Sequence, residues 1–198
     1  MASVPRFHLV HGQVAWAICN GQPPGAKTLD QLRYLRTLGV PFTEDELGIG
    51  RGNRLTYGYD HLIECGVAVW ALRRGMKPRA VVEFLVGERT TLRKLYRRVL
   101  RDQPEGALEA PWVKSRGASV PTLANEYFIY LFKGYKEPGV RIEANTFDEA
   151  ITFGAAFGDM VARVGHDVQP LCPLARLAIQ LVARALVAPE PKRGPAAL

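Results

Sequence analysis

RYLRTLGV, at residues 33–40, ends an amphipathic helix, and GIGRGNRLTYGY, at residues 48–59, follows it after a short acidic segment. An almost wholly apolar helix comes next, at residues 61–74, and a Gly-Met-Lys-Pro break separates it from a short helix at residues 79–85. A helix with a polar face followed by a glycine-rich hairpin with arginines at its tip is typical of a winged helix-turn-helix. The sequence therefore predicts a mainly α fold, with an N-terminal winged helix-turn-helix domain that carries a small β-hairpin wing, followed by a helical C-terminal domain.

The second helix of this domain is expected to begin at Lys27 or Thr28 and to end before Gly39, after a proline-containing break at residues 20–27. One side of this helix carries leucines, which suits packing against a core. The other side carries the predicted DNA-binding residues of the helix, which are Lys27, Thr28, Gln31, Arg33 and Tyr34. Arg and Gln can bind base edges with two hydrogen bonds, whereas simple solvation of a polar face is the alternative explanation. The glycine-rich segment that follows this helix favours contact with DNA bases over simple solvation.

The predicted wing combines the glycine-rich residues 48–52 with a returning strand at residues 54–59. Arg51, Asn53 and Arg54 would project from this wing towards phosphates or the minor groove. A Gly-x-Gly-x-Gly string also occurs in nucleotide-binding loops, but no apolar strand precedes it here and no helix begins within it. The wing is therefore the favoured interpretation.

Positive charge is concentrated in the first half of the chain. The 198 residues carry a formal net charge of +7, and residues 1–101 hold 16 Lys and Arg against 8 Asp and Glu. Part of this excess lies on a helix expected at residues 88–102, which carries an apolar stripe on one side and six cations on the other. We interpret it as a dimerising or linking helix with a solvated basic side, and phosphate contact by that side is the alternative. The charge balance favours a polyanionic partner.

Residues 28–86 resemble the DNA-binding domain of the MerR family of transcription regulators. The resemblance rests on the pair Arg33-Tyr34, on the string Gly52-Asn53-Arg54 with Tyr57 after it, and on the step Arg73-Arg74-Gly75-Met76. It implies a four-helix winged helix-turn-helix that binds a two-fold operator as a homodimer and bends or twists the promoter. It also implies that Arg33 and Tyr34 contact the major groove, and that Arg51, Arg54 and Tyr57 act in the wing.

The domain boundaries follow from composition. We expect the winged domain and its linking helix at residues 1–102, a linker rich in Pro, Gly, Ala and Ser at residues 103–121, a helical dimerisation or sensor domain at residues 122–188 and a disordered tail at residues 189–198. Within the third segment, helices are expected at residues 147–164 and 173–187. Its aromatic residues include Tyr127, Tyr130 and Tyr135, which are either core or the wall of a candidate ligand pocket.

Enzymatic activity is not expected, because the four histidines lack metal-ligand spacing and no nucleophile elbow or phosphate loop occurs. The three cysteines are interpreted as core residues, and no cofactor or metal is expected. No apolar run reaches the roughly 18 residues of a membrane span, and no signal-peptide pattern is present, so we expect a cytoplasmic protein. The expected partners are double-stranded DNA, a second copy of the chain, and RNA polymerase or a small-molecule effector. An adaptor or inhibitor that uses its winged helix for protein contacts is the alternative.

Overall fold

The computed structural model describes residues 4–47, 55–103, 108, 126–132, 141–144 and 168–190. Its elements, in chain order, are α1 (His11–Ile18), α2 (Ala26–Thr37), α3 (Tyr59–Arg73), α4 (Pro78–Gly87), α5 (Arg89–Arg101), β1 (Glu126–Phe132), β2 (Arg141–Ala144), β3 (Val168–Pro173) and α8 (Leu174–Leu186). The described chain is therefore mainly helical, as the sequence predicted. None of its helices is long and apolar enough to cross a lipid bilayer.

Glycine and proline set the ends of the helices on either side of the candidate DNA-binding region. Gly39 follows α2 with φ +86°, its amide donates to the Arg36 carbonyl, and the Val40 amide donates to the Leu35 carbonyl. This pattern closes a helix with a left-handed residue that glycine adopts without a steric cost. Gly75 ends α3 in the same way, and Pro78 begins α4, where its missing amide hydrogen costs nothing.

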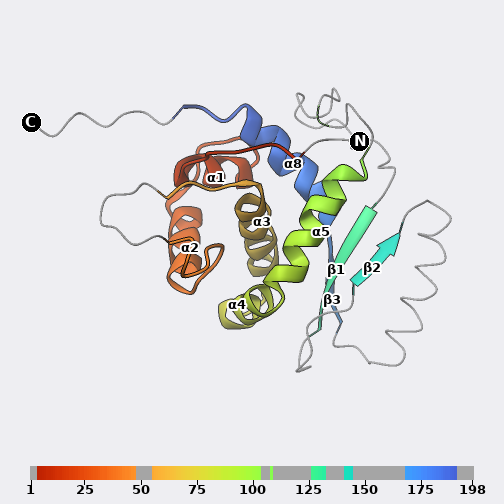
Figure 1. Ribbon diagram of the computed structural model, residues 1–198. Helices are drawn as coiled ribbons and strands as arrows, with labels where there is room; N and C mark the ends of the chain where they lie inside the picture. Colours follow the sequence, from red (N-terminus) through yellow and green to blue (C-terminus); the bar gives the residue numbers. More distant parts are fainter. Residues whose placement is uncertain are drawn as a thin grey trace, which may run out of the picture.

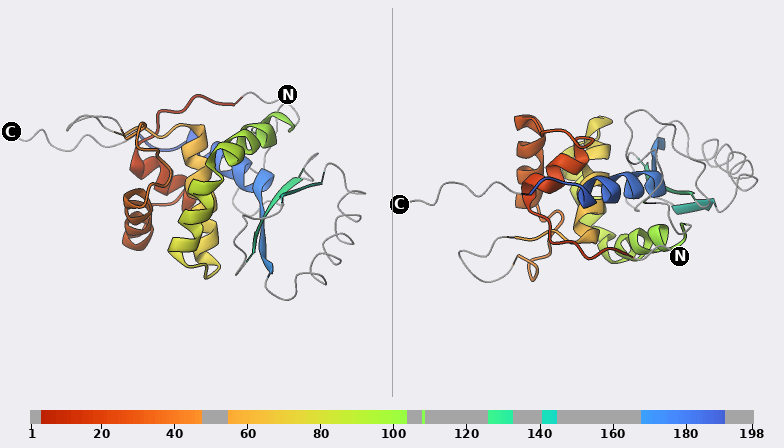
Figure 2. Two further views of the ribbon diagram at one scale, coloured as in Figure 1. Left: turned by 60° about the horizontal axis from the view of Figure 1, so that its bottom comes forward. Right: turned by 90° about the horizontal axis from the view of Figure 1, so that it is seen from above.

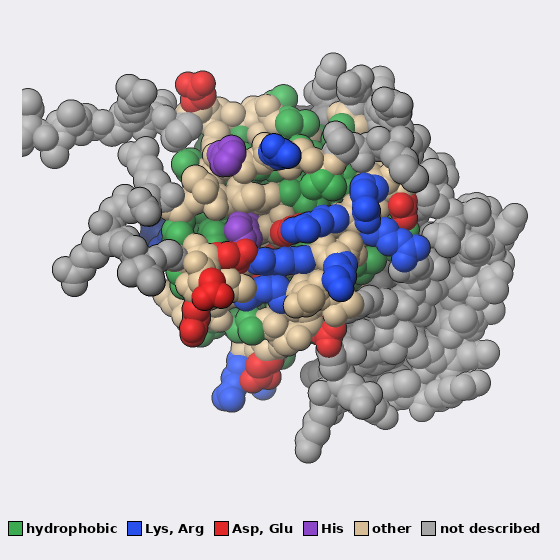
Figure 3. Space-filling view, viewed as in Figure 1, with side chains coloured by type: hydrophobic (Ala, Val, Ile, Leu, Met, Phe, Trp, Pro, Cys, Tyr) green, Lys and Arg blue, Asp and Glu red, His purple; other side chains and the backbone are tan. Residues whose placement is uncertain are grey.

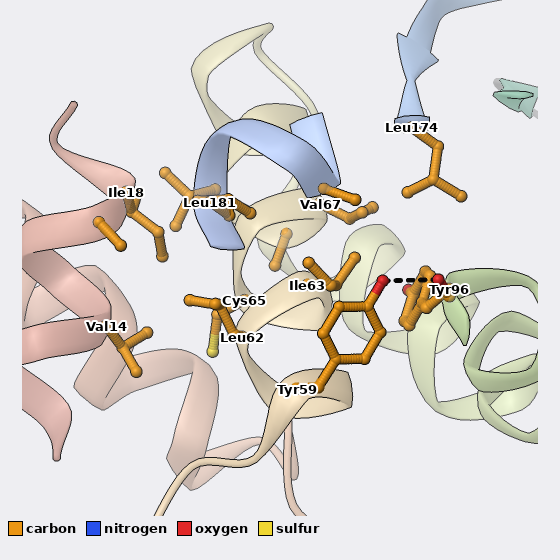
Figure 4. Close-up of a cluster of buried hydrophobic side chains, with 14 of the residues drawn as sticks. Val14, Ile18, Tyr59, Leu62, Ile63, Cys65, Val67, Tyr96, Leu174 and Leu181 are labelled. Carbon is orange, nitrogen blue, oxygen red and sulfur yellow. Dashed lines mark hydrogen bonds between the residues drawn. The ribbon is translucent and has the colours of Figure 1, made fainter. Parts of the chain in front are cut away.

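Helix α3 lies at the centre of the molecule, and its residues from Leu62 to Val69 are all buried. Helices α1 and α8 pack against it, and α8 also contacts α5 (Figure 1). Figure 4 shows Leu181 of α8 among the α3 side chains, close to Ile63 and Val67, and the Tyr59 hydroxyl donating to the Tyr96 carbonyl at 2.6 Å. The C-terminal helix therefore belongs to the same hydrophobic core as the N-terminal helices.

The described part of residues 122–188 is not wholly helical, which corrects the predicted helical C-terminal domain. Three antiparallel strands form a sheet in the order β2-β1-β3. Tyr127 and Ile129 of β1, two residues apart and therefore on one face of the strand, are both 1% exposed. The aromatic and β-branched residues of β1 favour a strand. The sheet lies beside α5 and α8, on the side away from α1 and α2 (Figures 1 and 2).

The predicted boundaries of the second half fall mostly on residues that the structure does not describe. Of the linker at residues 103–121 only residues 103 and 108 are described, and of the tail at residues 189–198 only residues 189 and 190. The helix predicted at residues 147–164 also lies outside the described residues. Strands β1 and β3 and helix α8 share one core with α1, α3 and α5.

Candidate nucleic-acid interface

Helix α2 presents the polar face that the sequence predicted. Leu32 and Leu35 are 3% and 0% exposed and hold the helix to the core. Lys27, Arg33 and Tyr34 are exposed on the other side, and Tyr34 is 52% exposed despite its aromatic ring. A large ring kept in water is available to a partner.

The remaining predicted residues of this face are less open. Gln31 is half-buried, and the half-buried Thr28 lies with its hydroxyl oxygen 3.6 Å from the thiol of Cys19. Arg33 forms an ion pair with Asp30, at 3.0 Å, and both side chains are more than half exposed. Such a surface pair contributes little to stability, so Arg33 can exchange Asp30 for an external acceptor at small cost.

The predicted wing residues Arg51, Asn53 and Arg54 lie outside the described residues. Tyr57, the fourth, is corrected: it is a core residue, 2% exposed. Its backbone forms an antiparallel bridge with Leu9, with hydrogen bonds of 2.8 and 3.1 Å, and its hydroxyl lies 3.1 Å from Nδ1 of His11. The chain therefore ties this tyrosine to its N-terminal segment, and Tyr57 is not available to DNA.

A segment at residues 39–47 joins α2 to the predicted wing; we call it the connector. Phe42, in its middle, is 3% exposed and packs its ring against Tyr57 and His61, with centroid distances of 4.8 and 4.6 Å. His61 accepts a hydrogen bond from the Gly58 amide at Nδ1, so its other nitrogen carries the proton and faces Glu46 at 3.2 Å. Burial lowers the pKa of His61, which keeps the ring neutral near pH 7.

Glu46 is the acidic anchor of the connector. Arg93 of α5 donates to both of its carboxylate oxygens, at 2.7 and 2.9 Å, and the Thr43 amide donates at 2.9 Å. Burial favours a higher pKa for Glu46, but the hydrogen bonds from Arg93, Thr43 and His61 outweigh it and hold the pKa well below its usual range. This carboxylate therefore stays charged near neutral pH.

A second carboxylate, Glu64 of α3, is 1% exposed. Arg89 donates to its Oε1 from Nε and Nη2, at 3.0 and 2.8 Å, and Nε of Arg93 lies 3.6 Å from its Oε2. Burial raises the pKa of Glu64 to about 6, against the opposing effect of Arg89 and Arg93. The same two guanidinium groups also donate to the connector carbonyls of Gly39, Pro41 and Phe42.

The sequence analysis did not identify Glu64 as a site residue, because the helix that contains it is otherwise almost wholly apolar. The signal was present: an acid inside a helix that is buried on all sides requires a cationic partner. The basic side predicted for α5 is also more occupied than expected, since Arg97 forms an ion pair with Asp60 in addition to the two arginines that bind Glu46 and Glu64. Figure 3 shows this row of basic side chains along α5, with acidic side chains of the connector on one flank.

The candidate ligand pocket receives no support from the tyrosine that can be placed. Tyr127 is buried, its hydroxyl donates to Asp102, and the Arg98 guanidinium lies 5.7 Å from its ring centroid. It is therefore a core residue beneath α5. Tyr130 belongs to β1 but its side chain is not among those described, and Tyr135 lies outside the described residues.

No family model, no curated protein and no solved structure matches this chain. Within the described ranges, no group of three or more His, Cys, Asp or Glu side chains is placed to hold a metal ion.

Proposed function

We propose that this protein is a sequence-specific DNA-binding regulator that acts as a homodimer and inserts the exposed face of α2 into the major groove. The observation that carries the proposal is the face itself, where Lys27, Arg33 and Tyr34 stand in water on a helix whose other side is fixed by buried leucines. The major groove is wide enough to admit an α-helix, and Arg and Gln are the side chains that pair best with its base edges. A winged helix-turn-helix with its wing at residues 48–59, in which Tyr57 is a core residue rather than a DNA contact, is the finer form of this proposal.

The charge distribution supports the same partner. In the half of the chain that holds α2, cations outnumber acids by two to one. Three acids of this half, Glu46, Asp60 and Glu64, are paired with arginines of α5. Each of these pairs is neutral overall, so the excess of the remaining cations over the remaining acids in this half is what attracts a polyanion.

The test is a selection of genomic fragments by the purified protein, followed by a salt titration on the best fragment. A shared two-fold motif is expected, with an affinity that falls by a log-log slope of about −0.9 for each phosphate neutralised. Retention of all fragments alike would reject sequence-specific recognition. Retention of none would reject DNA binding altogether.

Replacing Arg33 with alanine is expected to relax the sequence preference. A bidentate contact to a base discriminates by roughly 1–3 kcal/mol, so affinity for the best site should fall while affinity for random DNA changes little. Arg54→Ala is the matched comparison, because removing a phosphate-binding side chain from the wing weakens binding to every sequence and reduces the salt slope by about one. Competition binding with the selected site and a scrambled site measures both. Equal reductions on the two sites for Arg33→Ala would place Arg33 on the backbone.

One observation favours protein contact as the second candidate. Tyr34 is 52% exposed and Leu38, one turn later, is 37% exposed, so α2 also presents an apolar strip. Contiguous exposed apolar surface is one of the marks of a protein-binding site. An adaptor of this kind retains no DNA fragment, and its partner binding is abolished by Tyr34→Ala and kept with Arg33→Ala.

A further inference from the structure

Helix α5, which is distant from the connector in sequence, holds it by hydrogen bonds. Arg89 donates to the carbonyls of Gly39 and Phe42, and Arg93 donates to the carbonyl of Pro41 at 2.8 Å and to the Glu46 carboxylate. These hydrogen bonds begin at the first residue after the cap of α2 and end two residues before Gly48, where the predicted wing begins. Two arginines therefore hold most of the segment that joins the two parts of the proposed DNA site.

Glu64 binds the Arg89 guanidinium by hydrogen bonds and forms an ion pair with that of Arg93. Its Oε1 receives two hydrogen bonds from Arg89 and its Oε2 faces Nε of Arg93, so one buried carboxylate lies between both arginines and turns their remaining N–H groups towards the connector. Arginine suits this task because its planar fork donates in several fixed directions, whereas a lysine ammonium acts as a point charge. Since Glu64 is 1% exposed and sits on the central helix, the arrangement has a rigid base.

We propose that Glu64, Arg89, Arg93 and Glu46 form a positioning clamp that fixes the connector against α5, and with it the C-terminal end of α2, after which the connector begins. The inference rests on the proposed DNA-binding function and adds to it the residues that hold the site in register. Binding sites need supporting residues that fix the contacting groups to within about 0.5 Å, and the clamp supplies this support for the connector.

The direction of the change in DNA affinity distinguishes a positioning role of Glu46 from a simple effect of its charge. Glu46→Ala removes the carboxylate that Arg93 binds, and Glu44→Ala, at an exposed position in the same connector, is the matched control with the same change in net charge. If only charge mattered, both variants would bind DNA slightly more tightly. The clamp predicts instead that Glu46→Ala reduces affinity for the selected site by about 3- to 30-fold, the range typical of residues that act through a network of packed and hydrogen-bonded groups. Affinity for random DNA should be unchanged or raised, which general unfolding would not produce.

Arg93→Lys is the second variant, because it keeps the charge and removes the fork. It should reduce affinity for the selected site as Glu46→Ala does, and hydrogen exchange of the connector amides should accelerate in both variants while that of α3 does not. Unchanged site affinity in both variants overturns the clamp and leaves the proposed function standing. If the unaltered protein binds no DNA, the proposed function fails, and exchange decides the clamp alone: acceleration confined to residues 39–47 supports it, and unchanged exchange overturns it.

Discussion

Replacing Arg89 with alanine should lower the free energy of unfolding by about 3–5 kcal/mol, because it leaves the Glu64 carboxylate charged inside the protein without its main partner. Arg89 also donates to the carbonyls of Gly39 and Phe42, and the same substitution removes these hydrogen bonds. A decrease of this size is a large part of the roughly 5–15 kcal/mol that stabilises an ordinary domain. Urea unfolding followed by circular dichroism measures it.

Arg79→Ala is the matched control. Arg79 forms an ion pair with Glu83 at 2.8 Å, but its side chain is 91% exposed. A surface substitution of this kind changes stability by no more than about 0.5 kcal/mol. Equal effects of the two substitutions would contradict the prediction, because they would mean that the buried Glu64–Arg89 pair contributes no more to stability than an exposed pair.

The pH dependence gives a second check on the same pair. In the unaltered protein burial raises the pKa of Glu64 to about 6 from an ordinary value of 4.5, so this group favours folding most at low pH and that contribution disappears as the pH rises through 4.5–6. Without Arg89 the pKa of Glu64 rises further. At pH 5 the carboxyl is then mostly protonated in both proteins, whereas at pH 8 the unaltered protein holds it charged beside Arg89 and the variant must either bury an unpaired charge or bind a proton. The destabilisation by Arg89→Ala should therefore be smaller at pH 5 than at pH 8. A larger destabilisation at pH 5 would contradict this account.

Local signals were sufficient to place most helices. The leucines of α2, the Pro78 start of α4 and the apolar stripe of α5 predicted these elements to within about two residues, because each depends on periodicity and on punctuation by glycine and proline. Gly39 was also predicted correctly as the residue that ends α2. Exposure of Lys27, Arg33 and Tyr34 followed from the same periodicity.

Long-range partners were beyond such reasoning. Tyr57 fits the alternation of a wing strand, and only its bridge to Leu9 makes it a core residue. The aromatic run that contains Tyr127 fits a helix or a strand equally in a short window, and the pairing of β1 with β2 and β3 decides between them. The burial of the Glu64 carboxylate is explained only by its pairing with Arg89, which lies 25 residues away in the sequence. In each case the deciding interaction joins segments that are distant in sequence.

The place of α8 in the N-terminal core leads to the second large effect. A Cβ atom added to Gly66 of α3 would lie 2.2 Å from Cδ1 of Leu181, so α8 approaches α3 closely at a residue without a side chain. Leu181→Ala should lower the free energy of unfolding by about 2–5 kcal/mol, because it removes a side chain that is 1% exposed and leaves a cavity. Gly66→Ala should cost about 1–3 kcal/mol through overpacking, reduced by the higher helix propensity of alanine.

The two substitutions together should cost less than the sum of their separate effects, by about 1–3 kcal/mol, because the methyl group added at Gly66 occupies part of the space that Leu181 leaves. Gly66→Ala combined with Leu35→Ala is the control: Leu35 is a buried leucine of α2 that is not among the atoms nearest Gly66, so these two effects should add. Chemical denaturation of the single and double variants and of the unaltered protein completes the cycle. Additive behaviour of Gly66 and Leu181 would mean that α8 does not pack on α3 in solution. Coupling between them would mean that α3 and α8, which are far apart in the sequence, fold as one unit. A substitution in α8 would then alter the packing of α3, the helix that contacts α2 and the connector.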